Sequence, residues 1–314
     1  MRLPSIPAPL WDTIDEVGPR WSADIRGHSR RVMEGFSAIL ADAPKVGSTT
    51  KDIAYGPHRR QALDVYAPPE ARAASVLIFA HGGALVEGDK DRTPEIHSNV
   101  CWFMTRNHMI GINLEYRLAP EAMYPAATRD VAAAVQWTRK NIERFGGHPE
   151  KIFLMGHSAG ALHVGSYAYD RRFHPSDGPG VAGLIVLSGR VRAENLPENP
   201  NARNVEAYYG VDPQAMEQGS LATHVAPDSV PTMVGIAEYE SPLIDVHSAE
   251  LIHRIAAVQR RASRFFSLPR HNHSSTVAQI NTADDLVGPQ ILDFIARGAT
   301  RSPVRSRIGL PSPW

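Results

Sequence analysis

Four apolar residues lead directly into a serine that has a glycine two positions away on each side. The run Ile152–Met155 is followed by Gly156-His157-Ser158-Ala159-Gly160, the G-x-S-x-G pattern of a strand, a sharp turn and a helix. The turn requires both glycines because larger side chains would collide with neighbouring backbone. The pattern therefore predicts a strand that presents the Ser158 hydroxyl at its end as a nucleophile. Ala159 would begin the helix, so its N–H lacks a helical partner and is suited to bind a developing oxyanion.

Short runs rich in β-formers alternate with helical stretches over most of the chain. The eight candidate strands are 52–55, 62–66, 75–80, 110–115, 151–155, 182–187, 232–237 and 263–268. Between the fourth and fifth, the apolar face Val131, Val135, Thr138 and Ile142 predicts a helix that Gly146-Gly147 ends. Crossover helices imply parallel pairing. We therefore expect an α/β fold with a mostly parallel eight-stranded sheet and flanking helices.

The rest of the chain divides around this sheet. Residues 1–50 carry helical spacing at Val32, Phe36 and Leu40 and predict an N-terminal helical cap. Residues 51–300 form the predicted catalytic domain, in which 195–228 is a long excursion on the lid side of the site. Residues 301–314, with three prolines, are expected to be a loosely docked tail.

Composition excludes several classes of protein. The 33 basic and 33 acidic residues cancel, and a pI near 7.3 gives no electrostatic footprint for nucleic acid. A single cysteine, Cys101, excludes an internal disulfide framework, and three prolines interrupt residues 1–11 where a secretory signal would be apolar. We expect a cytoplasmic protein. Apolar runs such as 75–80 are too short to span a membrane.

A serine nucleophile needs a histidine to take its proton and a carboxylate to fix the histidine's tautomer. The acid is expected at the carboxyl end of the seventh strand, where 237–242 reads Ala-Glu-Tyr-Glu-Ser-Pro. We choose Glu240. Asp245 is an alternative, although it reads better as the N-cap of the following helix, and Glu238 is a third option.

The base is expected after the eighth strand, where 269–275 supplies two histidines ahead of another helix. We choose His273. His271 lies two positions earlier, but no carboxylate or cysteine cluster adjoins the pair, so the sequence favours no metal site.

The third strand leads into His81-Gly82-Gly83-Ala84. Adjacent glycines let backbone N–H groups point into a cavity without obstruction. The amides of Gly82 and Gly83, together with that of Ala159, are therefore predicted to form an oxyanion hole, and His81 to hold the loop.

These motifs together resemble the hormone-sensitive-lipase-like carboxylesterases of the α/β-hydrolase fold, over about residues 52–295. The matching segments are Tyr55-Gly56, Leu63-Asp64-Val65-Tyr66, His81-Gly82-Gly83, Tyr116-Arg117-Leu118-Ala119-Pro120, 156–160, 237–240 and 271–273. The resemblance implies an ester hydrolase without a cofactor, with Ser158 as nucleophile, His273 as base and an N-terminal cap over the acyl pocket. The chain departs from the family at Glu240, where Asp is usual, and at Ala84, where a third glycine is common.

The sequence therefore predicts a serine carboxylesterase that acts on small, apolar esters. The resemblance extends to arylformamidase-type hydrolases, so cleavage of aryl formamides or amides by the same residues is the alternative. A non-catalytic ligand-binding protein on the same fold is a third reading, disfavoured because nucleophile, base, acid and oxyanion loop are all present. A two-fold dimer through an edge strand or late helix is expected for this class.

Overall fold

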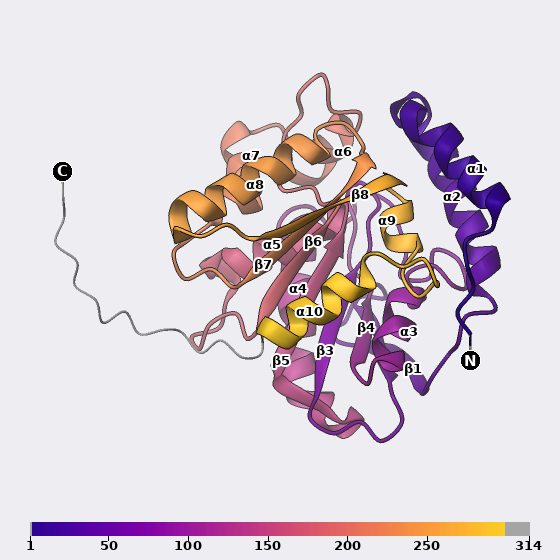
Figure 1. Ribbon diagram of the computed structural model, residues 1–314. Coiled ribbons are helices and arrows are strands. Elements are labelled where there is room, and N and C mark those ends of the chain that lie inside the picture. The colour runs from indigo at the N-terminus through magenta and orange to yellow at the C-terminus, as the bar shows by residue number, and fades with distance from the viewer. Residues whose placement is uncertain (1, 299–314) are drawn as a thin grey trace.

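One eight-stranded sheet runs through the computed structural model, which describes residues 2–298 (Figure 1). The strands lie in the order β1-β2-β4-β3-β5-β6-β7-β8. β1 and β4 each pair antiparallel with β2, and all other neighbours are parallel. The strands are β1 Ser48–Ala54, β2 Ala62–Ala67, β3 Ala74–Ala80, β4 Ile110–Leu114, β5 Gly147–His157, β6 Gly183–Leu187, β7 Thr232–Tyr239 and β8 Arg264–Asn272. The predicted α/β class and the predicted mostly parallel sheet are confirmed.

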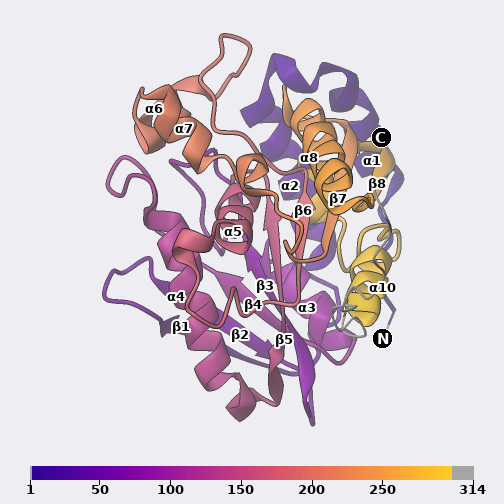
Figure 2. The same cartoon turned by 90° about the vertical axis from the view of Figure 1, so that its left-hand side faces the viewer.

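Helices cover both faces of this sheet. The longer ones are α1 Ala8–Val17, α2 Ile25–Leu40, α3 Ser98–Arg106, α4 Ala126–Asn141, α5 Ala159–Tyr169, α8 Ile244–Gln259 and α10 Gly288–Gly298. Figure 2 shows α4 and α5 on one side of the sheet and α3 and α10 on the other. No helix within residues 2–298 combines the length and apolarity needed to cross a lipid bilayer.

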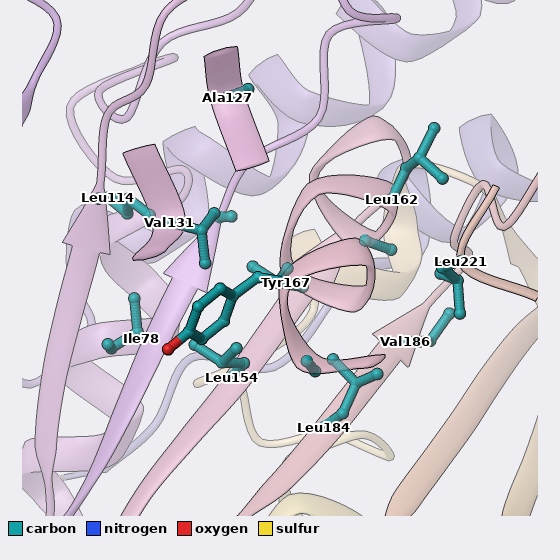
Figure 3. Packing of buried hydrophobic residues seen from close by; sticks show 14 of the residues in the cluster. Ile78, Leu114, Ala127, Val131, Leu154, Leu162, Tyr167, Leu184, Val186 and Leu221 are labelled. Atoms are coloured by element: carbon teal, nitrogen blue, oxygen red, sulfur yellow. The ribbon is translucent and has the colours of Figure 1, made fainter. Parts of the chain in front are cut away.

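The strands are apolar on both sides because each side packs against helices. In β3, Val76 and Ile78 point into the core under α4 and α5, while Leu77 and Phe79 point into the opposite core. Figure 3 shows the first of these cores, where Val131 of α4 and Tyr167 of α5 pack over the strands. The central strands β3 and β5 are therefore fixed from both faces, and their carboxyl ends form a rigid platform.

The residues before β1 form α1, the 3₁₀ helix η1 Gly18–Ala23 and α2. The predicted apolar face of α2 is buried at Val32, Phe36 and Leu40. The excursion between β6 and β7 contains α6 Ala202–Tyr209, α7 Pro213–Gly219 and the 3₁₀ helix η4 Leu221–His224. Both views place α6 and α7 at the same end of the sheet as α1 and α2 (Figures 1 and 2). The predicted tail, 301–314, lies outside the described residues.

A buried ion pair ties the loop after β4 to α4. Asp130 is fully buried and receives the Arg117 guanidinium at 2.6 Å and the Gln61 amide at 2.7 Å. It also accepts the backbone N–H of Arg117 at 2.9 Å. Arg117 of the 116–120 segment is thus paired with a buried carboxylate. Cys101 is fully buried in α3, where burial raises the pKa of its thiol well above the ordinary value, as expected for a packing residue.

Replacing Asp130 by alanine should lower the free energy of unfolding by about 3–5 kcal/mol, because Arg117 and Gln61 lose their buried partner. Urea unfolding followed by circular dichroism measures the loss. Asp177→Ala is the control, since it removes the exposed Arg139–Asp177 pair and should leave the unfolding midpoint nearly unchanged. Equal losses in both variants would contradict the assignment.

Candidate active site

The turn between β5 and α5 holds Ser158 in a conformation that few residues adopt. Its φ is 55° and its ψ is −122°. A Cβ on Gly156 would lie 2.4 Å from the backbone of Ala161, and one on Gly160 would lie 2.3 Å from the carbonyl oxygens of Ala80 and His81. Both glycines are therefore required by close backbone approach. We call residues 156–160 the nucleophile elbow.

The structure brings Ser158, His273 and Glu240 into one hydrogen-bonded line. The Ser158 Oγ lies 3.0 Å from His273 Nε2, and His273 Nδ1 lies 2.7 Å from Glu240 Oε2. The second carboxylate oxygen of Glu240 accepts the Ala237 N–H at 2.8 Å. Because a carboxylate accepts, Nδ1 carries the histidine proton, which leaves Nε2 free to accept the serine hydroxyl. The arrangement can move a proton from the serine to the histidine.

The two alternative acids lie elsewhere. Glu238 accepts the backbone N–H of Arg270 at 2.6 Å. Asp245 is exposed in the first turn of α8, and its side chain accepts the Val246 N–H at 2.8 Å. The N-cap position of α8 belongs to Leu243, so the interpretation of Asp245 as the cap was wrong by two residues. Neither carboxylate is bonded to His273.

His271 and His273, at the end of β8 and directly after it, have different hydrogen-bond partners. The main-chain N–H of His273 donates to the Tyr239 carbonyl at 2.9 Å, which ties the candidate base to the end of β7. His271 is buried, its Nδ1 lies 3.0 Å from the Ser275 hydroxyl, and burial lowers its pKa to about 4. Its ring packs edge-on against Trp11, 5.5 Å away. His271 therefore belongs to the packing behind the site.

The loop after β3 passes directly beside the nucleophile. A Cβ on Gly82 would lie 2.9 Å from the Ser158 Cβ, and one on Gly83, whose φ is +140°, would lie 1.7 Å from the Glu87 carbonyl oxygen. Within residues 2–298, the amides of Gly82, Gly83 and Ala159 donate to no other group. Three such amides thus lie on the elbow and on the loop that passes beside it.

His81 holds this loop as predicted. Its fully buried ring stacks on Tyr116 at 4.5 Å, and its Nε2 lies 3.1 Å from Glu115. The Tyr116 hydroxyl donates to the His81 carbonyl at 2.5 Å. Burial alone would raise the pKa of Glu115, but the hydrogen bond from His81 and the charge of Arg60 hold it below its ordinary value. Glu115 was not predicted, although its position directly after β4 indicated a side chain at this edge of the sheet.

The N-terminal helices reach the site through a buried tryptophan. Trp21 of η1 lies 6.4 Å from His273, measured between ring centroids, and its indole N–H donates to the Ser241 hydroxyl at 3.0 Å. Ser274 also donates to Ser29 of α2 at 2.8 Å. Nothing in the local sequence pattern indicated these contacts.

Arg270 clamps α1 to β8. Its guanidinium binds both carboxylate oxygens of Asp15, at 3.0 and 2.6 Å, and lies 4.3 Å from the centroid of the Trp11 ring. The clamp is three residues from the candidate base. Nowhere in residues 2–298 do three or more His, Cys, Asp or Glu side chains gather in a way that could hold a metal ion.

Known proteins resemble this chain in sequence. The family model BD-FAE matches residues 63–170, from β2 to the end of α5. A probable isoprenylcysteine alpha-carbonyl methylesterase of Arabidopsis thaliana is 29% identical over 201 residues, which are 60% of this chain and 46% of the relative. The esterase LipC of Mycobacterium tuberculosis is 25% identical over 239 residues, covering 70% of this chain and 58% of LipC. The chain thus spans about half the length of these relatives.

A solved structure extends the likeness to the whole fold. A hyperthermophilic esterase from the archaeon Pyrobaculum calidifontis superposes with a TM-score of 0.74 and 19% identity, over 96% of this chain and 100% of the esterase. At that identity the likeness concerns the fold. Taken with the sequence relatives, it agrees with the predicted resemblance to the hormone-sensitive-lipase-like carboxylesterases of the α/β-hydrolase fold.

Proposed function

We propose that the protein is a serine carboxylesterase that cleaves small apolar esters through an acyl-enzyme on Ser158. The observation that carries the proposal is the hydrogen-bonded line from Ser158 through His273 to Glu240. Sequence similarity supports it, since the relatives reported above are an esterase and a probable methylesterase.

The chemistry follows from this line. The Ser158 Oγ attacks the ester carbonyl carbon while its proton passes to His273 Nε2, and Glu240 stabilises the imidazolium that forms. The carbon–oxygen bond to the alcohol then breaks, and His273 returns the proton to the departing oxygen. Water attacks the acyl-enzyme by the same route and releases the acid.

The negative oxygen of the tetrahedral intermediate needs donors that are in place beforehand. We assign this role to the amides of Gly82, Gly83 and Ala159, which are free of other partners and adjoin the elbow. Ala84 adopts a left-handed φ of 48°, so the methyl group that replaces a third glycine leaves the loop conformation in place.

The N-terminal helices act as the cap in this proposal. Trp21 is buried beside His273, so its indole limits the volume for the substrate on that side. This fits a preference for small groups. The excursion 195–228 lies at the same end of the sheet and, in this proposal, covers the lid side of the site.

Ser158→Ala should reduce hydrolysis of p-nitrophenyl acetate and butyrate to background, a loss on the order of a millionfold in kcat for a serine triad. The wild-type chain should label with a fluorophosphonate probe and the variant should not. Circular dichroism controls for folding. Wild-type rates in Ser158→Ala would refute the nucleophile, and an unlabelled, inactive wild type would favour a ligand-binding protein.

Glu240→Gln should lower kcat by roughly 10³–10⁴-fold, because an amide does not stabilise the imidazolium or enforce the required tautomer. Asp245→Asn and Glu238→Gln are matched controls that remove one carboxylate each, and both should retain near-wild-type kcat. A larger loss in either control than in Glu240→Gln would move the acid to that residue.

Esters should be cleaved faster than anilides or aryl formamides of matched acyl length, because an amine is a much poorer leaving group than a phenolate. Rates on p-nitrophenyl esters of increasing chain length and on the matched amides measure the preference. Faster turnover of aryl formamides would instead assign the site to arylformamidase chemistry.

A further inference from the structure

His157 joins the segment that carries the nucleophile to the segment that carries the base. It is the last residue of β5 and is 4% exposed. Its Nε2 lies 2.8 Å from the main-chain carbonyl oxygen of His273, 116 residues away in sequence. The two rings lie 5.0 Å apart between centroids. Two histidines of different segments are thus bonded side by side behind the serine.

The direction of this hydrogen bond is fixed by chemistry. A carbonyl oxygen only accepts, so the Nε2 of His157 must carry the proton and donate it. Burial, and then the neighbouring His273 ring, lower the pKa of His157 to about 3, which keeps the ring neutral at working pH. Its other nitrogen faces the oxyanion loop, since a Cβ on Gly82 would lie 3.4 Å from Nδ1.

The main chain of His273 makes three hydrogen bonds. Its N–H donates to the Tyr239 carbonyl at 2.9 Å, and its carbonyl oxygen accepts the Thr276 hydroxyl at 2.9 Å as well as the His157 ring. Thr276 lies in α9 and accepts the hydroxyl of Ser188, the residue after β6, at 3.1 Å, so its bond reaches the sheet through a second side chain. His157 is a residue of the sheet itself and bonds this carbonyl directly.

We propose that His157 is a positioning residue, a neutral Nε2–H donor that holds the backbone of His273 so that its ring stays in line with the Ser158 hydroxyl. The inference rests on the proposed function. It gives the residue before the proposed nucleophile a role in positioning the proposed base. This role matters for the rate, because a displacement of about 1 Å between reacting groups costs on the order of 10²-fold.

The chain offers a matched control in His163. This histidine lies on α5, is 1% exposed, and has a pKa that burial likewise lowers to about 3. Neither of its ring nitrogens has a partner within residues 2–298, and its ring contacts Tyr116 and Tyr208. His163→Leu removes an equally buried histidine without touching His273.

The test compares His157→Leu, His157→Gln and His163→Leu in the full chain with p-nitrophenyl butyrate. His157→Leu should lower kcat by roughly 10–100-fold with KM within about twofold, and fluorophosphonate labelling should slow in parallel. His157→Gln, whose amide reaches the place of Nε2, should recover most of kcat. His163→Leu should keep wild-type kcat per folded molecule, with thermal melts reporting stability.

Three results would overturn the proposal: wild-type kcat in His157→Leu, equal losses in the Leu and Gln variants, or an equal loss in His163→Leu. If His157→Leu cannot be purified, His157→Asn replaces it, because its amide is one methylene shorter and does not reach the carbonyl. Activity that survives in Ser158→Ala would refute the proposed function itself, whereas a dead Ser158→Ala beside an unaffected His157→Leu would refute only this inference.

Discussion

The close approach of backbone at the nucleophile elbow is the constraint on which the site depends. Gly160 lies against the carbonyl oxygens of Ala80 and His81, so α5 begins in contact with the end of the neighbouring strand β3. The loop that follows β3 must then pass beside Ser158. The contact between Gly160 and the end of β3 therefore brings the amides of the elbow and the amides of that loop close to each other.

The order of the strands explains why Glu240 and His273 lie near Ser158. β5, β6, β7 and β8 are parallel neighbours, so their carboxyl ends meet at one edge of the sheet. Glu240 follows β7 and His273 follows β8. The N–H of His273 bonds to the Tyr239 carbonyl, which sets the distance between the acid loop and the base loop. This main-chain hydrogen bond thus helps to set the distance between the Glu240 and His273 side chains.

The local sequence pattern was sufficient to predict the strands and the turns that follow them. It was insufficient to predict contacts between segments that are far apart in sequence. The strands and the turn at the elbow follow from apolar runs and glycine spacing, and position after a strand was enough to choose Glu240 and His273, which the structure brings together with Ser158. Trp21, Arg270 and the donor role of His157 depend on contacts between distant segments, for which periodicity carries no signal. The start of α8 was misplaced because Asp245 resembles a cap, whereas Leu243 takes that position. The short helices α6 and α7 were missed among scattered Asn, Pro and Gly, since buried tyrosines such as Tyr208 stabilise them by tertiary packing.

The Arg270 clamp links the helix α1 to the segment that carries His273, the proposed base. Asp15 and Arg270 are 255 positions apart in sequence, yet the arginine is three residues before His273. The ion pair between Arg270 and Asp15 is exposed, so added salt should weaken it. The stacking of Arg270 on Trp11 should be less sensitive to salt. A displacement of α1 would therefore be transmitted through Asp15 and Trp11 to the segment that carries His273.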